Sequence, residues 1–338
     1  MIDSAETLRP AGVTVLVTGA SGAIGRFVVG ELIDRGCDVV AITRQLHPQL
    51  PQRPGLAWRQ AAIDNVQALS AIIEQTRCSR VVHLAATILN REDDLPGALA
   101  ANTLGAACVF EAARRNKVER IVHASSKAVF GPLEGEFGHP EFRPVPEDHP
   151  RNPQSIYALT KSLAEDVADF YCRRHGMEIV SVRFGTSAGP GKGPQHAGAA
   201  VLSRIVENPV RGIPVIISGG GDQRDEIVYT VEVAHGLATI CLAPGSLSGV
   251  MHLDSGQLVS LRDIADAVRK HIPLASIEVG GGMNYMGYGG IYGRLDGSRA
   301  RQEAGYVPRF SLDGWVADYI RRVREADLAS AAKHKEAP

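Results

Sequence analysis

A glycine-rich turn near the N-terminus constrains the fold of this chain more than any other feature. The segment Thr18-Gly19-Ala20-Ser21-Gly22-Ala23-Ile24-Gly25 follows a strand-like apolar run at residues 13–17 and leads into a helical pattern. Glycines let the backbone turn sharply, and the free N–H groups at the start of the helix face negative charge. This order predicts a site for the pyrophosphate of a dinucleotide. Its candidate contacts are Gly19, Ser21, Gly22, Ala23, Ile24 and Gly25.

Strand-like runs alternate with helical patterns through the first half of the chain. Strands are expected at 13–18, 38–43, 56–60, 80–85, 120–124 and 178–183, and helices at 23–35, 66–75, 97–115 and 155–175. This alternation predicts a parallel sheet that is covered by helices on both faces. Because crossovers are right-handed, the expected α/β fold is a doubly wound, Rossmann-type sheet.

The pattern changes after about residue 185, where segments shorten and glycine and proline become more frequent. Strands are expected at 215–217, 227–230 and 250–253, and helices at 201–207, 231–241, 261–271 and 312–322. We expect a smaller C-terminal α/β lobe that holds the substrate over the carboxyl ends of the sheet strands. The expected organisation is a leader at 1–12, a dinucleotide-binding domain at 13–185, a mainly substrate-binding lobe at 186–327 and a frayed tail at 328–338. A glycine-rich stretch at 280–290 is either a surface loop or a lid on the substrate.

Composition and charge argue against several kinds of partner. The formal net charge is −1, which gives no reason to expect nucleic acid or an anionic membrane. No apolar run approaches the roughly 20 residues of a membrane span, and the N-terminus lacks the pattern of a signal peptide. The five cysteines are scattered without a CxxC pair, which is typical of free thiols in a reducing compartment. A cytoplasmic location is therefore expected.

Tyr157 and Lys161 lie four residues apart on an expected helix, so they share a face. A phenol has a reference pKa of about 10, and a nearby ammonium lowers it by favouring the phenolate. Such a tyrosine exchanges a proton with a substrate hydroxyl or carbonyl while a hydride moves to or from a nicotinamide. The alternative for this pair taken alone is simple surface packing. The dinucleotide turn upstream favours the chemical interpretation.

Ser126 follows the expected strand at 120–124. A hydroxyl at the carboxyl end of such a strand is well placed to hydrogen-bond a reacting oxygen. The alternative is an ordinary turn serine.

These ordered motifs resemble the extended short-chain dehydrogenase/reductase family, also called the NAD-dependent epimerase/dehydratase family. The resemblance covers nearly the whole chain. It rests on residues 18–25, His83-Leu84-Ala85-Ala86, Asn102, residues 125–131, the Tyr157 and Lys161 pair, Arg183 with Gly189-Pro190-Gly191, residues 224–229 and residues 295–300. It implies that Tyr157 is the catalytic acid/base, that Lys161 holds the nicotinamide ribose and tunes Tyr157, and that Ser126 polarises the substrate oxygen.

The resemblance also implies where the other contacts lie. Cofactor contacts beyond the turn are expected at Thr43, Arg44, Ala62, Ile63, Leu84, Ala85, Ala86, Asn102, Tyr157, Lys161, Phe184 and Ser187. Substrate contacts are expected at Thr87, Ser126, Thr186 and Arg224. No metal site is expected, and His83 receives no catalytic role because no metal partners lie at ligand spacing. The family further implies a homodimer through the helices near 97–115 and 155–175.

The end of the second strand departs from the usual NAD pattern, in which an acidic residue holds the ribose hydroxyls. Thr43 occupies that position and Arg44 follows it. Because an arginine there can pair with a 2′-phosphate, NADP is the expected cofactor and NAD the alternative. Ala62 falls where the family often has an aspartate near the adenine, and Asp64 is the candidate replacement.

Two further departures concern the reaction and the substrate. Sugar dehydratases of the family carry an Asp-Glu pair directly after the Ser126 position, where this chain has Lys127 and Ala128. A 4,6-dehydratase is therefore not expected. Members of the family that act on nucleotide sugars hold the diphosphate with three sequence elements, and two of them are missing here. Arg224 is the third, and it serves either as a phosphate ligand or as a partner of a neighbouring carboxylate.

The expected activity is hydride transfer at a secondary alcohol or ketone of a sugar or nucleotide sugar, by an epimerase or by a dehydrogenase/reductase. One alternative is a dehydrogenase/reductase of a small substrate without a nucleotide. An alternative of another class is a non-catalytic dinucleotide-binding sensor, although such sensors often lose the reactive trio that this chain keeps.

Overall fold

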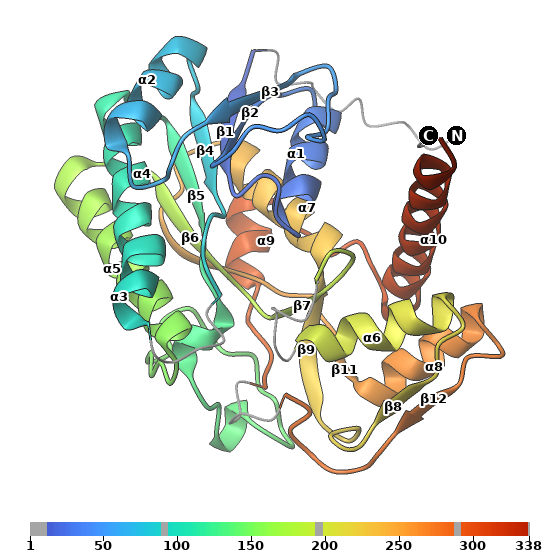
Figure 1. Ribbon diagram of the computed structural model, residues 1–338. Coiled ribbons are helices and arrows are strands. Elements are labelled where there is room, and N and C mark those ends of the chain that lie inside the picture. The colour runs from blue at the N-terminus through green and yellow to red at the C-terminus, as the bar shows by residue number, and fades with distance from the viewer. Residues whose placement is uncertain (1–11, 89–93, 193–198, 287–291, 337–338) are drawn as a thin grey trace, which may run out of the picture.

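The computed structural model describes residues 12–88, 94–192, 199–286 and 292–336, and it confirms the expected doubly wound α/β fold (Figure 1). Seven parallel strands form the main sheet in the order β10-β6-β5-β4-β1-β2-β3. They are β1 (Thr14–Thr18), β2 (Asp38–Thr43), β3 (Leu56–Gln60), β4 (Arg80–His83), β5 (Arg120–Ala124), β6 (Ile179–Phe184) and β10 (Gly249–Leu253). The strand order reverses between β1 and β4, which is where open α/β sheets bind their ligands.

Helices bury both faces of this sheet. One face is covered by α1 (Gly25–Asp34) and α7 (Thr230–Leu242), and the other by α2 (Val66–Thr76), α4 (Gly105–Arg115) and α5 (Ile156–His175) (Figure 1). Val15 and Val17 belong to the core on the first face, whereas Leu16 belongs to the core on the second. This alternation follows from the two-residue period of a strand. Because both faces are buried, β1 is apolar throughout its centre.

Helix α4 continues a longer helical run that starts with α3 (Leu95–Ala98) and a π-helical turn at Leu99–Leu104. The whole run, Leu95–Arg115, is long and apolar enough to cross a membrane by length and composition. The expectation that no such segment exists was therefore wrong. Its hydropathy has another explanation, because α4 packs against α2 and α5 as a core helix over the sheet.

The C-terminal lobe contains two small sheets. Strands β7 (Thr186–Ala188), β9 (Arg224–Tyr229) and β11 (Leu258–Ser260) form one, and β8 (Val215–Ile217) pairs with β12 (Ile277–Val279) in the other. Helices α6 (Ala199–Val210), α8 (Leu261–His271) and α10 (Leu312–Glu336) pack around them. Helix α8 begins with a capping box in which Ser260 and Asp263 bond each other's backbone N–H groups.

Three elements past residue 186 pair with or pack on the main sheet and its helices, although the sequence assigned that region mainly to the smaller lobe. Strand β10 pairs with β6, α7 packs on α1, and α9 (Ser298–Ala304) packs on β10. An apolar strand such as β10 has the same local pattern in either sheet, so its partner is set by tertiary packing.

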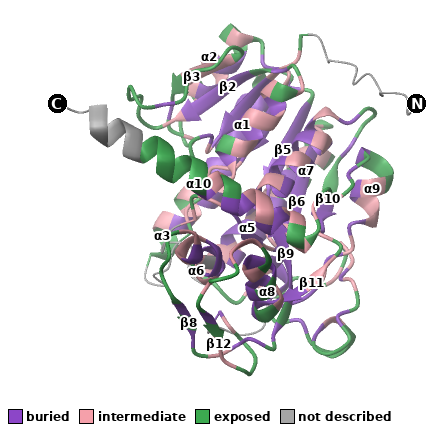
Figure 2. Ribbon diagram, turned by 90° about the vertical axis from the view of Figure 1, so that its right-hand side faces the viewer, coloured by how far each residue is buried: buried purple, intermediate pink, exposed green. Residues whose placement is uncertain are grey.

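Other differences concern short segments and the ends of the chain. Strands β7, β11 and β12 were not expected, because each has only three residues, which are too few to show a period, and at least one of them is polar, unlike the wholly apolar run of β8. Helix α10 was expected to end near residue 322 but continues to Glu336, through most of the tail expected to be frayed. Its residues from Arg324 to Ser330 are exposed (Figure 2). The expected leader, apart from Gly12, lies outside the described residues.

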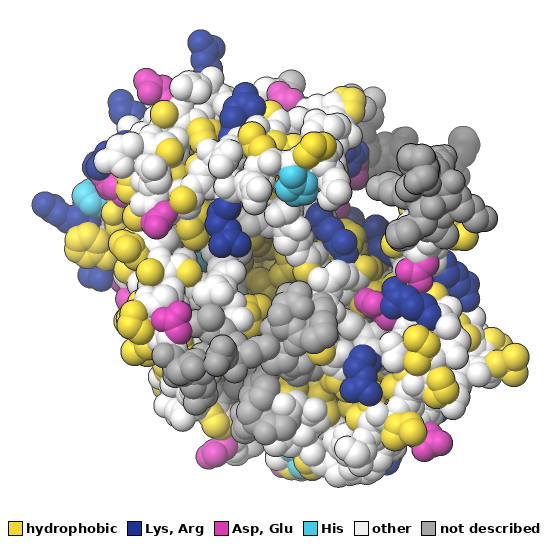
Figure 3. Space-filling model, in the orientation of Figure 1, with side chains coloured by type: hydrophobic (Ala, Val, Ile, Leu, Met, Phe, Trp, Pro, Cys, Tyr) yellow, Lys and Arg dark blue, Asp and Glu magenta, His cyan; other side chains and the backbone are white. Residues whose placement is uncertain are grey.

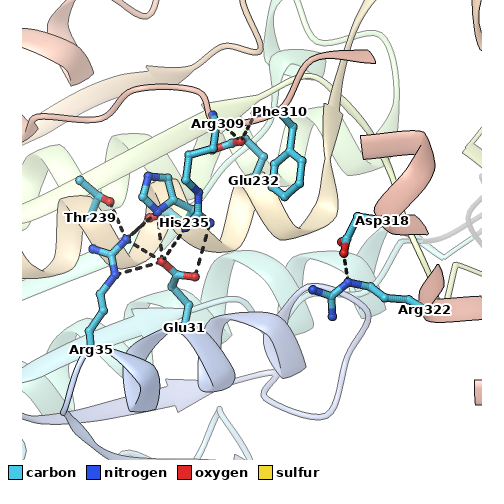
Figure 4. A network of polar contacts seen from close by, with 9 residues as sticks. All are labelled: Glu31, Arg35, Glu232, His235, Thr239, Arg309, Phe310, Asp318 and Arg322. Atoms are coloured by element: carbon cyan, nitrogen blue, oxygen red, sulfur yellow. Dashed lines mark hydrogen bonds and ion pairs between the residues drawn. The ribbon is translucent and has the colours of Figure 1, made fainter. Parts of the chain in front are cut away.

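A polar network joins α1, α7 and the segment before α10 (Figure 4). The Glu31 carboxylate accepts hydrogen bonds from Arg35 at 2.7 Å and lies 3.0 Å from Nδ1 of His235. Arg309 approaches the same carboxylate at 3.4 Å. Glu232 in turn accepts the backbone N–H of Arg309 at 2.8 Å. The network therefore attaches a late segment of the chain to α1, the first helix.

Candidate active site

The turn between β1 and α1 is packed so closely that only glycine fits at two positions. Gly19 has a φ of +67°, and a Cβ there would lie 2.8 Å from the backbone nitrogen of Ala85. A Cβ on Gly25 would lie 2.1 Å from the carbonyl oxygen of Gly19. No side chain of a described residue caps the start of α1. The N–H groups of Arg26, Phe27 and Val28 bond carbonyl oxygens of the turn, so the N–H groups of residues 23–25 are the ones that can face an anion. The six predicted turn contacts, Gly19, Ser21, Gly22, Ala23, Ile24 and Gly25, all lie here.

Thr18 holds the segment after β4 beside this turn. Its Oγ1 accepts hydrogen bonds from the N–H groups of Leu84 and Ala85, each at 3.2 Å. The same hydroxyl lies 2.7 Å from Nδ1 of His83. Burial, helped by the charge of Lys161, lowers the pKa of His83 to about 3, so this imidazole is neutral. The sequence analysis did not identify Thr18 as a site residue, although a hydroxyl at the end of a buried strand could have pointed to it.

Asn102 supports the far end of the same segment. Its side chain accepts the N–H of Thr87 at 2.8 Å and donates to the carbonyl oxygen of Thr87 at 3.0 Å. It also donates to Oγ1 of Thr160 on α5 at 3.0 Å. Asn102 is buried and lies in the π-helical turn, a distortion that is frequent at functional sites. Asn102 therefore fixes Thr87, and Thr18 fixes Leu84 and Ala85. Of the predicted contacts in this segment, Ala86 is exposed and Thr87 is half-buried.

The ends of β2 and β3 carry the predicted contacts for the adenosine part of a cofactor. The Thr43 hydroxyl closes its own turn by donating to the carbonyl oxygen of Gln45 at 2.9 Å. The Arg44 side chain is exposed and has no ion-pair partner within the described ranges. Ala62 is exposed, and Ile63 packs so closely on Gly105 that a Cβ there would lie 2.7 Å from Cδ1 of Ile63.

Ser126, Tyr157 and Lys161 come together at the carboxyl end of β5. Oγ of Ser126 accepts the N–H of Ala128 at 3.1 Å, and the Ser126 side chain hydrogen-bonds that of Tyr157. Nζ of Lys161 lies 5.9 Å from the centroid of the Tyr157 ring. It donates to the carbonyl oxygen of Ala124, at the end of β5, at 2.7 Å. The three residues predicted to be catalytic therefore form one cluster.

Burial sets the charge state of this cluster. It raises the pKa of Tyr157 to about 12, although the hydrogen bond with Ser126 acts in the opposite direction. It also lowers the pKa of Lys161 to about 8, against the influence of the Glu165 carboxylate. The sequence led us to expect a lowered pKa for Tyr157, but burial raises it instead. The resting tyrosine is therefore a phenol that carries its proton.

Two predicted cofactor contacts lie at or just after the end of β6, and one of them, Ser187, contacts an unexpected lysine. Phe184 ends β6, and Ser187 lies in β7 with 5% of its surface exposed. Nζ of Lys192 donates to the carbonyl oxygen of Ser187 at 2.6 Å and also contacts its hydroxyl. Burial lowers the pKa of Lys192 to about 7. Lys192 was missed because a lone lysine in a loop gives no pattern.

The predicted substrate contacts Thr186 and Arg224 behave differently. The Thr186 hydroxyl donates to Oδ2 of Asp225 at 2.9 Å, so it is engaged within the protein. Arg224 is exposed, and its side chain pairs with no carboxylate in the described part of the chain. The ion pair with Asp225 or Glu226 that was its alternative role does not form. Asp225 pairs instead with Lys127, at 2.5 Å.

The arrangement fits a nicotinamide dinucleotide. The uncapped, glycine-lined turn suits a pyrophosphate, and the reactive cluster stands at the carboxyl ends of neighbouring strands. Figure 3 shows the surface hollowed between the main domain and the C-terminal lobe, with hydrophobic side chains on its floor and Lys or Arg side chains at its rim. The glycine-rich stretch considered as a lid lies partly outside the described residues, and Gly280 bonds the carbonyl oxygen of Ile217.

Comparisons with known proteins agree with this geometry. The chain is 27% identical over 267 residues to a putative UDP-glucose 4-epimerase from Methanocaldococcus jannaschii, which covers 76% of this chain and 82% of that protein. It is 26% identical to a dTDP-glucose 4,6-dehydratase from Streptomyces antibioticus, with 92% of each covered. Its fold matches MoeE5 in complex with UDP-glucuronic acid and NAD, with a TM-score of 0.77, 28% identity and coverage of 93% of this chain and 99% of that one.

A family model also matches the chain. The model described as the NAD dependent epimerase/dehydratase family matches residues 15–249, which is more than half of the chain. That range holds the glycine-rich turn, Ser126, Tyr157 and Lys161. The chain therefore belongs to the NAD dependent epimerase/dehydratase family.

Proposed function

We propose that this protein is an NAD(P)-dependent oxidoreductase or epimerase that transfers a hydride at a secondary alcohol or ketone carbon of a sugar or nucleotide sugar. The observation that carries the proposal is the convergence of Ser126, Tyr157 and Lys161 at the end of β5, on the same sheet edge as the glycine-rich turn. The putative UDP-glucose 4-epimerase and the complex of MoeE5 with UDP-glucuronic acid support the sugar class.

Tyr157 acts as the acid/base. As a phenol with a raised pKa it holds a proton ready for a carbonyl oxygen that is gaining negative charge. In the opposite direction the deprotonated form of Tyr157, a phenolate, accepts the hydroxyl proton as the hydride leaves the same carbon. The Ser126 hydroxyl stabilises the reacting oxygen by a hydrogen bond in either direction. When bound, the nicotinamide accepts or supplies the hydride.

Lys161 keeps a positive charge beside the tyrosine and fixes the end of β5. Its ammonium makes the transient phenolate less costly than it would be in an uncharged pocket. Because burial brings the pKa of Lys161 to about 8, this help is present near neutral pH and is lost as pH rises past that value. Base catalysis by Tyr157 is therefore assisted most where Lys161 is still protonated.

The residues after Ser126 argue against an elimination reaction. Nζ of Lys127 donates a hydrogen bond to Oδ1 of Asp225 at 2.5 Å, and Ala128 has no functional group. Neither supplies the acid or base that removal of water requires. The resemblance to a dTDP-glucose 4,6-dehydratase extends along the chain, but we propose epimerase or dehydrogenase/reductase chemistry for this protein.

NADP is the cofactor that the end of β2 favours, with NAD as the alternative. Arg44 is exposed and unpaired within the described residues, so its guanidinium is free for a 2′-phosphate. No acidic side chain occupies the Thr43 position to hold ribose hydroxyls. The solved structure of MoeE5 holds NAD, and both cofactors are compared in the tests below.

We further propose a cytoplasmic homodimer whose interface lies over α4 and α5. Leu104 and Phe170 belong to this surface, and each is more than half exposed, at 54% and 53%. Exposed apolar side chains of this size are typical of a surface that another protein covers.

An assay with purified protein tests the function. UDP-glucose, UDP-glucuronic acid, their free sugars and simple ketones are each supplied with NAD or NADP. We expect turnover of at least one sugar substrate. Tightly retained NAD(H) on the purified protein would favour an epimerase, whereas weakly held NADP(H) would favour a dehydrogenase/reductase. Dinucleotide binding without turnover of any compound would favour the sensor.

A further inference from the structure

Lys127, the residue next to Ser126, carries a buried charge that the proposed chemistry does not use. Its side chain is 2% exposed, and Nζ donates to Oδ1 of Asp225 at 2.5 Å and to the carbonyl oxygen of Gly293 at 3.0 Å. Asp225 lies on β9 in the C-terminal lobe and is 0% exposed. The pair therefore joins the end of β5 to the lobe that we propose holds the substrate.

Asp225 collects further donors from the C-terminal part of the chain. Its Oδ1 accepts the N–H of Gly293 at 3.1 Å, and its Oδ2 accepts the hydroxyl of Thr186 at 2.9 Å. The hydroxyl of Tyr285 approaches Oδ2 at 3.4 Å. Lys127 is thus fixed by an anion that is itself held by β7 and by two separate segments of the lobe.

An ion pair in this position is poorly explained by stability alone. Two buried charges lose their hydration, and apolar replacements of similar volume are often as stable or more stable. A role in orientation accounts for it better. Lys127 is the first residue of the short 3-10 helix Lys127–Phe130, and Ser126 caps this helix through the N–H of Ala128. Contacts that hold Lys127 in place therefore also hold the orientation of its neighbour Ser126.

We propose that Lys127 and Asp225 are positioning residues that couple the placement of the C-terminal lobe to the orientation of the Ser126 hydroxyl. The catalytic role of Ser126 rests on the proposed function, but the coupling does not. It predicts that the amide of Ala128, which bonds Ser126, is protected from hydrogen exchange by the Lys127–Asp225 pair.

The test removes both charges while keeping the side-chain volumes. Lys127→Met alone leaves the Asp225 carboxylate buried without a cation, so we expect a large fall in the melting temperature. The double variant Lys127→Met/Asp225→Asn should have a melting temperature close to that of the wild type. In the double variant we still expect faster exchange at Ala128, and turnover lower by on the order of 10- to 100-fold, because a small misplacement of a catalytic group has that effect. Dinucleotide affinity should stay near that of the wild type.

The matched control lies at the opposite end of the same strand. Arg120, also 2% exposed, pairs with Glu178 at 3.0 Å. Arg120→Met/Glu178→Gln should change stability but neither Ala128 exchange nor turnover.

Wild-type Ala128 exchange and turnover in the stable double variant would overturn the proposal. If the double variant does not fold, Lys127→Arg tests the coupling in its place. A guanidinium cannot place one nitrogen between Asp225 and Gly293 as Nζ does. Unchanged Ala128 exchange in folded Lys127→Arg would equally contradict the coupling. Since exchange needs no substrate, a wild-type protein without turnover would count against the proposed function only.

Discussion

At the scale of single residues, the dinucleotide turn depends on the absence of side chains. Gly25→Ala would place a Cβ 2.1 Å from the backbone oxygen of Gly19, so the turn has to shift. We expect dinucleotide affinity, measured by calorimetry, to fall by at least about tenfold because the N–H groups that we assign to the pyrophosphate move with the turn.

Gly30→Ala is the matched control on the same helix. The nearest atom to its Cβ would be Nη1 of Arg53 at 3.8 Å, which is ordinary contact. This change should leave affinity unaltered and stabilise the helix by up to about 1 kcal/mol. Equal affinities for the Gly25 and Gly30 variants would show that the turn does not bind the cofactor.

Arg44 decides between the two dinucleotides in our account. Arg44→Ala removes the guanidinium that we assign to the 2′-phosphate, so the dissociation constant for NADP should rise about tenfold or more while that for NAD hardly changes. Arg59, which is also exposed and lies on the neighbouring strand β3, offers a control. An equal effect of Arg44→Ala on both cofactors would remove the argument for NADP.

Some residues of the site were accessible from sequence and others were not. Ser126, Tyr157 and Lys161 were found because they stand at fixed distances within local motifs. Asp225 was quoted as part of a motif and as an alternative partner of Arg224, whereas its partnership with Lys127 spans 98 residues of sequence. Burial likewise reversed the expected direction for the pKa of Tyr157. Desolvation depends on the whole surrounding fold, which a spacing pattern does not contain.

At the scale of elements, the network around Glu31 attaches the segment before α10 to α1 (Figure 4). Burial alone would raise the pKa of Glu31, but hydrogen bonds from His235 and Arg35 and the charge of Arg309 lower it to about 2. A folded pKa below the unfolded value stabilises the protein above the unfolded pKa, and the gain is lost as pH falls through the folded value. The contribution of Glu31 is therefore complete near neutral pH and declines between about pH 4.5 and pH 2.

Glu31→Gln should lower the free energy of unfolding at pH 7 by up to about 3 kcal/mol, the equivalent of that pKa shift. The difference from the wild type should shrink as pH falls below about 4.5. Urea unfolding at several pH values measures it. Asp169→Asn removes an exposed pair with Arg173 and should change stability by less than about 1 kcal/mol at any pH. A Glu31→Gln deficit that is constant with pH would contradict the assignment.

The bounds of several strands and helices followed from local sequence patterns, but the pairing between strands that are distant in sequence did not. Strands β2, β3 and β5 and helix α8 have the bounds expected from the sequence. Strand β10 was recognised as a strand but assigned to the smaller lobe, because pairing with β6 joins residues about 70 positions apart. Helix α10 exceeded its expected length because its later turns are polar and exposed, without an apolar period that marks a helix.

At the scale of the whole molecule, the account predicts a second copy of the chain over α4 and α5. The Phe170 ring is 53% exposed on α5. Phe170→Asp would place a charge within the proposed apolar interface, so the dimer should dissociate. Light scattering coupled to gel filtration, at several concentrations, measures the mass.

Leu274→Asp is the control, because Leu274 is 97% exposed and lies away from α4 and α5, between α8 and β12. This variant should remain a dimer. A wild-type chain that is monomeric at every concentration, or the same mass for both variants, would exclude the proposed interface.

Tyr157→Phe tests whether Tyr157 is the acid/base of hydride transfer. Tyr171→Phe on the same helix is the control, since its hydroxyl lies near Glu111 at 3.4 Å and outside the cluster. With a substrate found in the assay above, the Tyr157 variant should bind dinucleotide as the wild type does, while its turnover falls by about 10²- to 10⁴-fold. Undiminished turnover by Tyr157→Phe would contradict the account.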